Sequence, residues 1–353
     1  MNVGICTDKE YWNQAALNLG ASIYHSWEWG DLRQAEGWRS WRVLTEENDQ
    51  PVAVTHILEK RLPLRLGALL YAAHGIVSRE NDDAAVVTTA RWLKNFARER
   101  RAFLLRADPE FADTDDNKKQ QLVENGFRSI PDQWSFWNSP RATMVVDLKP
   151  PEDDILHRMR STHRQRIRNA IRDGIDIEVG TEPSHLQDFY NMVLKSSQRQ
   201  GFVLRDSGHF ELVRQIFLKA GKGLIFIARQ NGRPAAAVLS LFFGSTCLYL
   251  HGGFDPEIKL TGATETLHWK AMQWAKQMGC TKYDFLGTGT KHPPMEGNRG
   301  YGLYSYKKGF GAELVYTAGY FELRRGKARY GLLRLAERNP KLVDLAVKIR
   351  SLR

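Results

Sequence analysis

Two adjacent lysines flanked by aromatic residues stand at the end of a glycine-rich stretch. Residues 302–311 have the sequence GLYSYKKGFG, and seven glycines fall between Gly287 and Gly311, counting both. Glycine at this density disfavours regular helix or strand, so we predict a loop that lies over a site. A lysine ammonium such as that of Lys307 can stabilise a developing oxyanion or hold a phosphate. A surface loop kept soluble by its lysines is the alternative, and spacing alone does not decide between the two.

Acyl transfer from an activated ester to an amine is a reaction that such a site suits. It requires a cation or amide donors for the tetrahedral oxyanion, and a path for the amine proton. The chain contains no GxxxxGK[ST], HExxH, GxSxG or paired CxxC sequence, and no GxGxxG after a predicted strand. The usual signatures of nucleotide hydrolysis, dehydrogenation, zinc catalysis and serine hydrolysis therefore do not apply. We expect catalysis by positioning, with no metal and no cofactor.

The composition favours an intracellular protein with anionic partners. At 353 residues the chain exceeds one ordinary hydrophobic core, which predicts two domains. Its 51 Lys and Arg against 40 Asp and Glu give a net charge of +11, which suits nucleic acid, nucleotide diphosphates or anionic lipid headgroups. Three scattered cysteines indicate neither a disulfide framework nor a zinc site. The chain has no recognisable signal peptide and no apolar run of membrane-spanning length, so we expect it in the cytoplasm.

The two halves of the chain contain similar sequences about 180 residues apart. Residues 42–61 and 226–245 share a hairpin pattern, and 91–108 and 268–287 each combine a helix with a following strand. Two diverged copies of one mixed α/β unit explain both matches, although two hairpins can also look alike through their turns alone. The break at Pro150–Pro151 marks a natural domain boundary.

Two basic segments suit anionic partners. The tail 328–353 has apolar residues at helical spacing, and we expect it to dock on the core, with an anionic surface as the alternative. A helix predicted over 154–174 carries six arginines, and they suit contact with phosphate backbones, although a solvated helix face is the more ordinary interpretation. The apolar residues of that helix expected to face inward are Ile155, Met159, Ile167 and Ile171. The arginines singled out for phosphate contact are Arg160, Arg164 and Arg168.

Further candidates lie in the second half of the chain. Arg205 and His209 flank the start of a predicted helix, and Tyr249 stands near the end of a strand, where mixed α/β folds often place ligands. Arg205 could instead form an ion pair with Asp206 or Glu211, and an isolated histidine is more often structural than catalytic. The residue types alone leave both interpretations open.

Several motifs, taken together and in order, resemble the Fem family. Fem proteins are aminoacyl-tRNA-dependent transferases that add amino acids to the side chain of peptidoglycan precursors. The resemblance covers most of the chain and is strongest from Arg160 to Phe321. The motifs include W-x-W-x-x-L-R (27–33), R-x-x-x-R-x-x-I-R-x-A-x-R-x-G-I (160–175), G-R-P-A-A-A-V (232–238), W-A-K-x-x-G-C-x-x-Y-D-F-L-G (274–287) and G-L-Y-x-Y-K-K-G-F-G (302–311).

The resemblance implies an α/β (α+β) fold of two tandem acetyltransferase-like (GNAT-like) domains. We expect residues 1–148 to form the first domain and 149–318 to form the second, which carries the main site. Residues 319–353 are expected to pack back on the first domain. No long heptad pattern fits between residues 176 and 310, so the helical arm of some members is not expected.

The resemblance also implies roles for individual residues. Lys307, preceded by the aromatic Tyr306, matches the motif associated with catalysis in the family. Tyr306 replaces a more common Phe, His209 replaces Tyr, and the run that starts at His251 replaces Tyr-Gly-Ala, which leaves the acceptor open. The residues that match precursor-binding positions are Arg33, Asp108, Arg205, His209 and Tyr249.

The reaction implied by the resemblance is aminoacyl transfer from aminoacyl-tRNA to an amine of a UDP-linked or lipid-linked muropeptide. The tRNA would meet the arginines of the predicted basic helix, and a lipid-linked acceptor would bring the protein to the inner face of the membrane. An acyl-CoA donor is the first alternative, although the acetyltransferase pyrophosphate loop is not visible in either half. Transfer to another amine is the second alternative, and a non-catalytic binder of RNA or membrane surfaces is the third.

Overall fold

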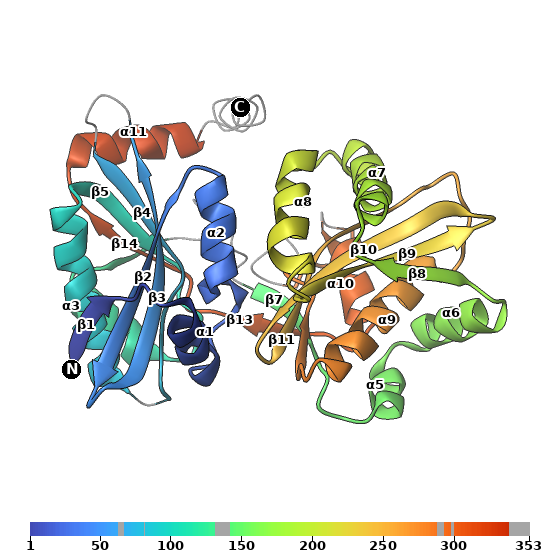
Figure 1. Ribbon diagram of the computed structural model, residues 1–353, viewed down its shortest axis with the longest axis horizontal. Helices are drawn as coiled ribbons and strands as arrows, with labels where there is room; N and C mark the ends of the chain where they lie inside the picture. Colours follow the sequence, from blue (N-terminus) through green and yellow to red (C-terminus); the bar gives the residue numbers. More distant parts are fainter. Residues whose placement is uncertain (63–66, 81, 131–141, 288–292, 298–299, 339–353) are drawn as a thin grey trace. The chain divides into compact units, whose positions relative to one another are not determined.

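The chain divides into two compact units, Met1–Arg141 with Tyr316–Arg353 and Ala142–Val315 (Figure 1). Among the described residues, each unit is built on one sheet of seven strands. None of the described helices is longer than 18 residues, and none has the length and apolar composition that crossing a bilayer requires. The computed structural model describes the chain except for residues 63–66, 81, 131–141, 288–292, 298–299 and 339–353.

The sheet of the first unit has the strand order β1-β2-β3-β4-β5-β14-β6. β1 to β4 are antiparallel neighbours, β4 and β5 run parallel, and β14 pairs antiparallel with β5 and β6. A C-terminal strand therefore lies inside a sheet of N-terminal residues. The strands are β1 (Asn2–Ile5), β2 (Arg39–Glu47), β3 (Gln50–Arg61), β4 (Ala68–Ser78), β5 (Ala102–Ala107), β6 (Arg128–Ile130) and β14 (Tyr320–Arg324). The helices are α1 (Lys9–Asn18), α2 (Trp27–Ala35), α3 (Asp83–Glu99), α4 (Asp116–Glu124) and α11 (Lys327–Arg338), with a short turn η1 (Ile23–His25).

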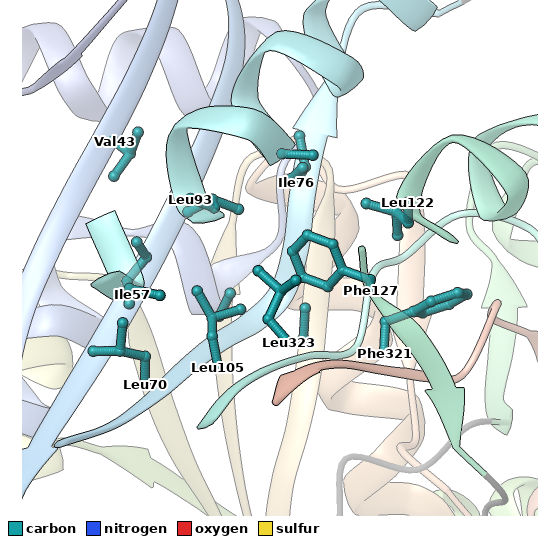
Figure 2. Close-up of a cluster of buried hydrophobic side chains, with 14 of the residues drawn as sticks. Val43, Ile57, Leu70, Ile76, Leu93, Leu105, Leu122, Phe127, Phe321 and Leu323 are labelled. Atoms are coloured by element: carbon teal, nitrogen blue, oxygen red, sulfur yellow. The ribbon is translucent and has the colours of Figure 1, made fainter. Parts of the chain in front are cut away.

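Helix α3 shows how local sequence builds the first core. Asp82 caps the helix by accepting a hydrogen bond from the Ala85 amide at 2.9 Å, which satisfies one of the free N–H groups at the helix start. Figure 2 shows the cluster that α3 joins, in which Phe321 and Leu323 of β14 lie among side chains of β3, β4 and β5. The predicted inward face of the helix is confirmed, because its members are at most 2% exposed: Val86, Ala90, Leu93 and Ala97.

The sheet of the second unit has the strand order β13-β7-β12-β11-β10-β9-β8. Figure 1 shows α7 and α8 on one face of this sheet and α9 on the other. The strands are β7 (Ala142–Asp147), β8 (Asp176–Gly180), β9 (Gly223–Gln230), β10 (Arg233–Phe243), β11 (Thr246–Phe254), β12 (Lys282–Asp284) and β13 (Glu313–Tyr316). The helices are α5 (Glu152–Arg158), α6 (Ser161–Arg172), α7 (Pro183–Gln200), α8 (Ser207–Val213), the π-helical turn η3 (Arg214–Leu218), α9 (Ala263–Gln277) and α10 (Tyr301–Lys308).

The two sheets repeat one pattern, as the sequence predicts. In each, three antiparallel strands are followed by a helix and then by a strand parallel to the third: β2-β3-β4 with α3 and β5, and β9-β10-β11 with α9 and β12. The hairpins at 42–61 and 226–245 are equivalent in this pattern. The interpretation as two copies of one mixed α/β unit is confirmed.

Three local expectations differ from the structure. Residues 142–148, which we placed in the first domain, belong to the second unit, since their strand β7 pairs with β12 and buries Met144 and Val146 in the second core. The single helix expected over 154–174 is two helices, since the backbone is extended at Met159 (ψ 150°), and Ile171 is 50% exposed rather than inward. Finally, part of the glycine-rich segment predicted as a loop forms α10, which Gly300 initiates in the left-handed conformation (φ 90°).

Candidate active site

A split between two parallel strands organises the second unit. β11 and β12 pair only from Thr246 with Lys282 to Leu248 with Asp284. Beyond that point the chain after β12 continues to pair with β7 on its other side, where the Phe285 amide donates to the Met144 carbonyl at 2.8 Å. The edge of β11 from residue 249 onward therefore has no partner strand on that side within the described residues. An open strand edge of this kind leaves backbone groups available to a ligand.

Lys307 lies at this split and closes the end of β12. Its side chain is almost fully buried, with the residue only 3% exposed. The Nζ donates to the carbonyl oxygens of Phe285 (2.7 Å), Leu286 (3.2 Å) and Gly287 (2.7 Å). An ammonium has three N–H donors, so these contacts use all of them. Burial lowers the pKa of Lys307 to about 8, while the nearby carboxylate of Asp284 opposes the shift.

By binding the three carbonyls, Lys307 holds the backbone after β12 in a conformation that few residues other than glycine adopt. Leu286 has φ 60°, the left-handed region, which is costly for a residue with a branched side chain. Its amide donates to Asp284 Oδ1 at 2.7 Å, so the turn is fixed from both sides. Lys307 thus acts as a clamp on the strand end. To donate to an oxyanion directly, it would have to exchange one of its carbonyl partners.

Tyr306 joins an aromatic cluster beneath this clamp. Its ring lies 5.2 Å from Phe310 and 6.1 Å from His268, measured between centroids. Burial raises the pKa of Tyr306 well above its usual value, so the phenol stays protonated at neutral pH. The Tyr306 carbonyl accepts a hydrogen bond from Nε2 of His163 at 3.1 Å, which ties α6 to α10.

His268 is a central member of this cluster that sequence reasoning missed. It lies on α9 and is 3% exposed, with Nδ1 3.1 Å from the hydroxyl of Tyr283. Its ring packs 4.7 Å from Tyr249 and 4.8 Å from Phe285. Burial, followed by the charge of Lys307, lowers the pKa of His268 to about 3, so the ring is neutral. The segment HWKAMQW has an ordinary amphipathic pattern, and nothing in it marks one histidine as part of a site.

A bulge in β11 separates two neighbouring candidates. Across from β11, Ser240 faces Tyr249 and Leu239 faces His251, so Leu250 is the extra residue. Because adjacent positions on β10 alternate between faces, Tyr249 and His251 point to opposite sides of the sheet. Tyr249 contacts His268 on the α9 side, and burial raises its pKa far above the usual value.

On the other face, His251 joins two predicted substrate residues. Its ring lies 5.4 Å from Phe210 of α8, and the ring of His209 lies 5.2 Å from the same Phe210. Burial, followed by the charges of the nearby His209 and Arg205, lowers the pKa of His251 to about 4. The N-cap Asp206 accepts a hydrogen bond from the His209 amide at 2.9 Å, which fixes the start of α8. Arg205, His209 and His251 therefore form a second group, distinct from Lys307, Tyr306 and Tyr249.

The two first-unit candidates are held by partners of their own. Arg33, at the end of α2, forms an ion pair with Glu36, and its guanidinium lies 5.5 Å from the Trp38 ring centroid. Asp108 follows β5 and is 6% exposed; its oxygens accept hydrogen bonds from the Tyr71 hydroxyl and the His74 amide, both at 2.9 Å.

The turn that Asp108 caps is strained. His74 has φ 58° and Gly75 has φ 64°, two consecutive left-handed residues within β4. The ring of His74 stacks on Tyr24 at 3.9 Å between centroids, and its Nδ1 pairs with Glu110. Strained residues of this kind concentrate at functional sites, since neighbouring groups must over-determine them.

The arginines of the basic helix divide between structural contacts and solvent. Arg160 donates to the Ser305 hydroxyl at 3.2 Å, and Arg164 donates to the His157 carbonyl at 2.9 Å. Arg166 pairs with the buried Glu265 at 2.7 Å. Arg168 is exposed. Two of the three arginines singled out in the sequence thus brace α5, α6 and α10.

Comparison with known proteins agrees with the motif analysis. A family model described as Acetyltransferase (GNAT) domain matches residues 157–308. The Lipid II:glycine glycyltransferase of Staphylococcus epidermidis is 21% identical over 91% of this chain and 92% of its own length. The crystal structure of FemX has a TM-score of 0.86 at 18% identity, and the match covers 95% of this chain and 100% of that one. The resemblance to the Fem family is confirmed.

A similar fold is also found in proteins with lower structural similarity and lower sequence identity. A tandem GNAT protein from the clavulanic acid biosynthesis pathway has a TM-score of 0.53 at 10% identity, covering 92% of this chain and 98% of its own. The predicted fold class, two tandem acetyltransferase-like domains, is confirmed. The match to the acetyltransferase family model includes α10 and its clamp lysine, so the candidate active site lies inside the Fem-like second unit.

The contact between α6 and α10 gives a first prediction for this Fem-like unit. A Cβ at Gly309 would collide with the ring of His163. We expect G309A to lower the free energy of unfolding by about 1–3 kcal/mol, because the helices must separate to admit the methyl group. G302A is the matched control, since a Cβ at Gly302 meets open space within α10 and replaces a poor helix former. Urea denaturation measures both, and equal stability of the two variants would contradict the prediction.

Proposed function

We propose that this protein transfers an aminoacyl group to an amine of a peptidoglycan precursor and so forms an amide bond. The protein is an aminoacyltransferase. The proposal is supported above all by the resemblance to Lipid II:glycine glycyltransferases over 91% of the chain. The FemX-like fold and the clamped strand split of the second unit agree with it.

The proposed donor is aminoacyl-tRNA. Its ester is already activated, so the acceptor amine attacks the ester carbonyl, the C–O bond breaks and the tRNA hydroxyl leaves with a proton from the amine. The reaction then needs no cofactor beyond this co-substrate. A net charge of +11 suits a polyanionic donor, and the exposed Arg168 is available for a phosphate contact.

The two groups of the second unit would have different tasks. Arg205, His209 and His251 would bind an anionic part of the precursor on the α8 face. Lys307 would hold the strand split open and place its positive charge near the tetrahedral oxyanion. Asp108 and Arg33, in the first unit, are proposed as further precursor contacts.

A second candidate donor is acyl-CoA. The match to the acetyltransferase family model favours it, although neither half of the sequence shows the pyrophosphate loop of acetyltransferases. The two donors give products that differ in mass, so one assay separates them.

The test offers the purified protein two acceptors and two donor classes. A mixture of charged tRNAs and a mixture of acyl-CoAs are each incubated with a nucleotide-linked and a lipid-linked muropeptide, and the products are identified by mass spectrometry. The proposal expects an aminoacylated muropeptide only in reactions that contain tRNA. Acylation from CoA alone would replace the proposed donor, and unmodified muropeptides in every reaction would overturn the proposed function.

A further inference from the structure

Within the described residues, helix α11 packs on the first unit through the face that carries Tyr330 and Leu333. The Tyr330 hydroxyl donates to Glu322 Oε2 at 2.8 Å, and the Arg324 guanidinium lies 4.4 Å from the Tyr330 ring centroid. Leu333 packs with Tyr330 against the cluster that contains Trp38 and Phe103. These contacts fix the rotation of the helix about its own axis. The opposite face must therefore point away from the sheet.

That opposite face carries an apolar stripe. Leu332 is 68% exposed and Leu335 is 64% exposed, and both rank among the most exposed large apolar residues of the described chain. Ala328 is exposed too and lies four residues before Leu332, so the three share one side of the helix. The predicted docking of the tail 328–353 on the core is seen at Tyr330 and Leu333, and residues 339–353 lie outside the described part of the chain. Ala328, Leu332 and Leu335 take no part in that contact.

The charges around the stripe have one sign. From Leu323 to Leu335 the sequence contains five Lys or Arg and no Asp or Glu. Arg325, Lys327 and Arg329 are exposed. An amphipathic helix that combines exposed leucines with flanking cations has the composition of segments that lie in the interface of an anionic membrane. Contact between two copies of this face would bring like charges together, which disfavours self-association.

We propose that the outer face of α11 binds an anionic phospholipid surface, with Leu332 and Leu335 entering the headgroup boundary and the neighbouring cations contacting lipid phosphates. This inference goes beyond the transfer reaction and does not depend on it, since the surface would bind lipid whichever donor or acceptor the enzyme uses. If the acceptor is lipid-linked, binding of α11 to the membrane would place the enzyme and its substrate on the same membrane surface.

The experiment is co-sedimentation of the full chain with vesicles of phosphatidylcholine alone or mixed with phosphatidylglycerol. We expect binding to the mixed vesicles that weakens as salt is raised. L332E/L335E should lower the partition coefficient at least about tenfold, because carboxylates replace the inserted side chains. The matched control is V123E, which changes an apolar residue of α4 that is 51% exposed, and it should bind like the unchanged protein.

Three results would overturn the proposal. They are equal sedimentation with both kinds of vesicle, unchanged binding of L332E/L335E, and an equal loss of binding in V123E. A change in oligomeric state of L332E/L335E without a change in vesicle binding would assign the face to a protein contact instead. Transfer to a nucleotide-linked muropeptide, measured in the same samples without vesicles, should stay unchanged and reports separately on the proposed function.

Discussion

Replacing Lys307 by methionine is expected to reduce the rate of aminoacyl transfer at least about 100-fold. Methionine has a similar length but cannot donate to the carbonyls of Phe285, Leu286 and Gly287, which would then be left without their cation in a buried place. The left-handed turn at Leu286 loses its support, and any charge stabilisation of the oxyanion is lost with it. Single-turnover kinetics measure the rate, and binding of the precursor is measured separately.

The matched control is K308M, because Lys308 is adjacent in sequence but exposed. It should transfer at close to the original rate. K307R keeps a cation that can still donate to carbonyl oxygens, and we expect partial activity from it. Undiminished turnover by K307M would remove Lys307 from the mechanism. Loss of precursor binding in parallel with the rate would limit its role to holding the strand end.

The pH dependence separates loss of charge from loss of fold. Burial lowers the pKa of Lys307 from 10.5 to about 8, so transfer should decline above about pH 8 as the ammonium loses its proton. Between these two pKa values the unfolded chain binds more protons at this group than the folded chain does. The contribution of Lys307 to the free energy of unfolding therefore rises with pH in that window. A rate that falls while this contribution grows is not explained by the effect of Lys307 on folding, and K307R should extend activity to higher pH.

The substitution E322Q is expected to destabilise the first unit by roughly 3–5 kcal/mol. Glu322 lies on β14 with no exposed surface, and its Oε1 accepts hydrogen bonds from Nε and a terminal nitrogen of Arg106 at 2.8 and 2.6 Å. Arg106 is itself 1% exposed, so a neutral glutamine would remove a carboxylate that compensates this buried positive charge. Urea denaturation followed by circular dichroism measures the loss.

A double substitution and a surface control test this explanation. R106M/E322L removes both charges and should recover much of the loss, since a buried pair replaced by apolar residues is often neutral. E99Q changes an exposed carboxylate of the same unit and should have little effect. An E322Q variant as stable as E99Q would show that the pair is dispensable.

Acid should produce the same loss in the unchanged protein. Burial alone would raise the pKa of Glu322, but the charge of Arg106 and the hydrogen bonds from Tyr330 and Arg324 hold it below its usual value. The stabilisation from this carboxylate is therefore complete above its unfolded pKa, near 4.5, and is lost as the pH falls through the lowered value.

The sequence predicts the elements well wherever a local pattern decides them. The apolar face of α3 and the β2–β3 hairpin follow from periodicity and turn chemistry, and the repeat of the hairpin reveals the tandem fold. Lys307 is found by its position between aromatic residues near the end of a glycine-rich stretch.

The remaining features of the candidate site depend on contacts between distant segments. No local pattern indicates that the Lys307 ammonium is enclosed by three carbonyls, because these belong to a turn some twenty residues earlier. The bulge at Leu250, which places Tyr249 and His251 on opposite faces, is a matter of register against β10. The break at Met159 is likewise set from a distance, since the Arg160 amide donates to the Gly309 carbonyl at 2.8 Å.

The place of β14 in the first sheet determines the order in which the protein can be completed on the ribosome. β6 pairs with β14 and with no other described strand, and the buried Arg106 pairs with Glu322 of β14. Residues 142–315 are contiguous, so the second unit can fold as soon as it emerges. The N-terminal unit, although translated first, must wait with an open sheet until almost the whole chain has been made. A chain that ends just before residue 320 should therefore, once released from the ribosome, protect residues 142–315 from proteolysis and leave the earlier unit sensitive.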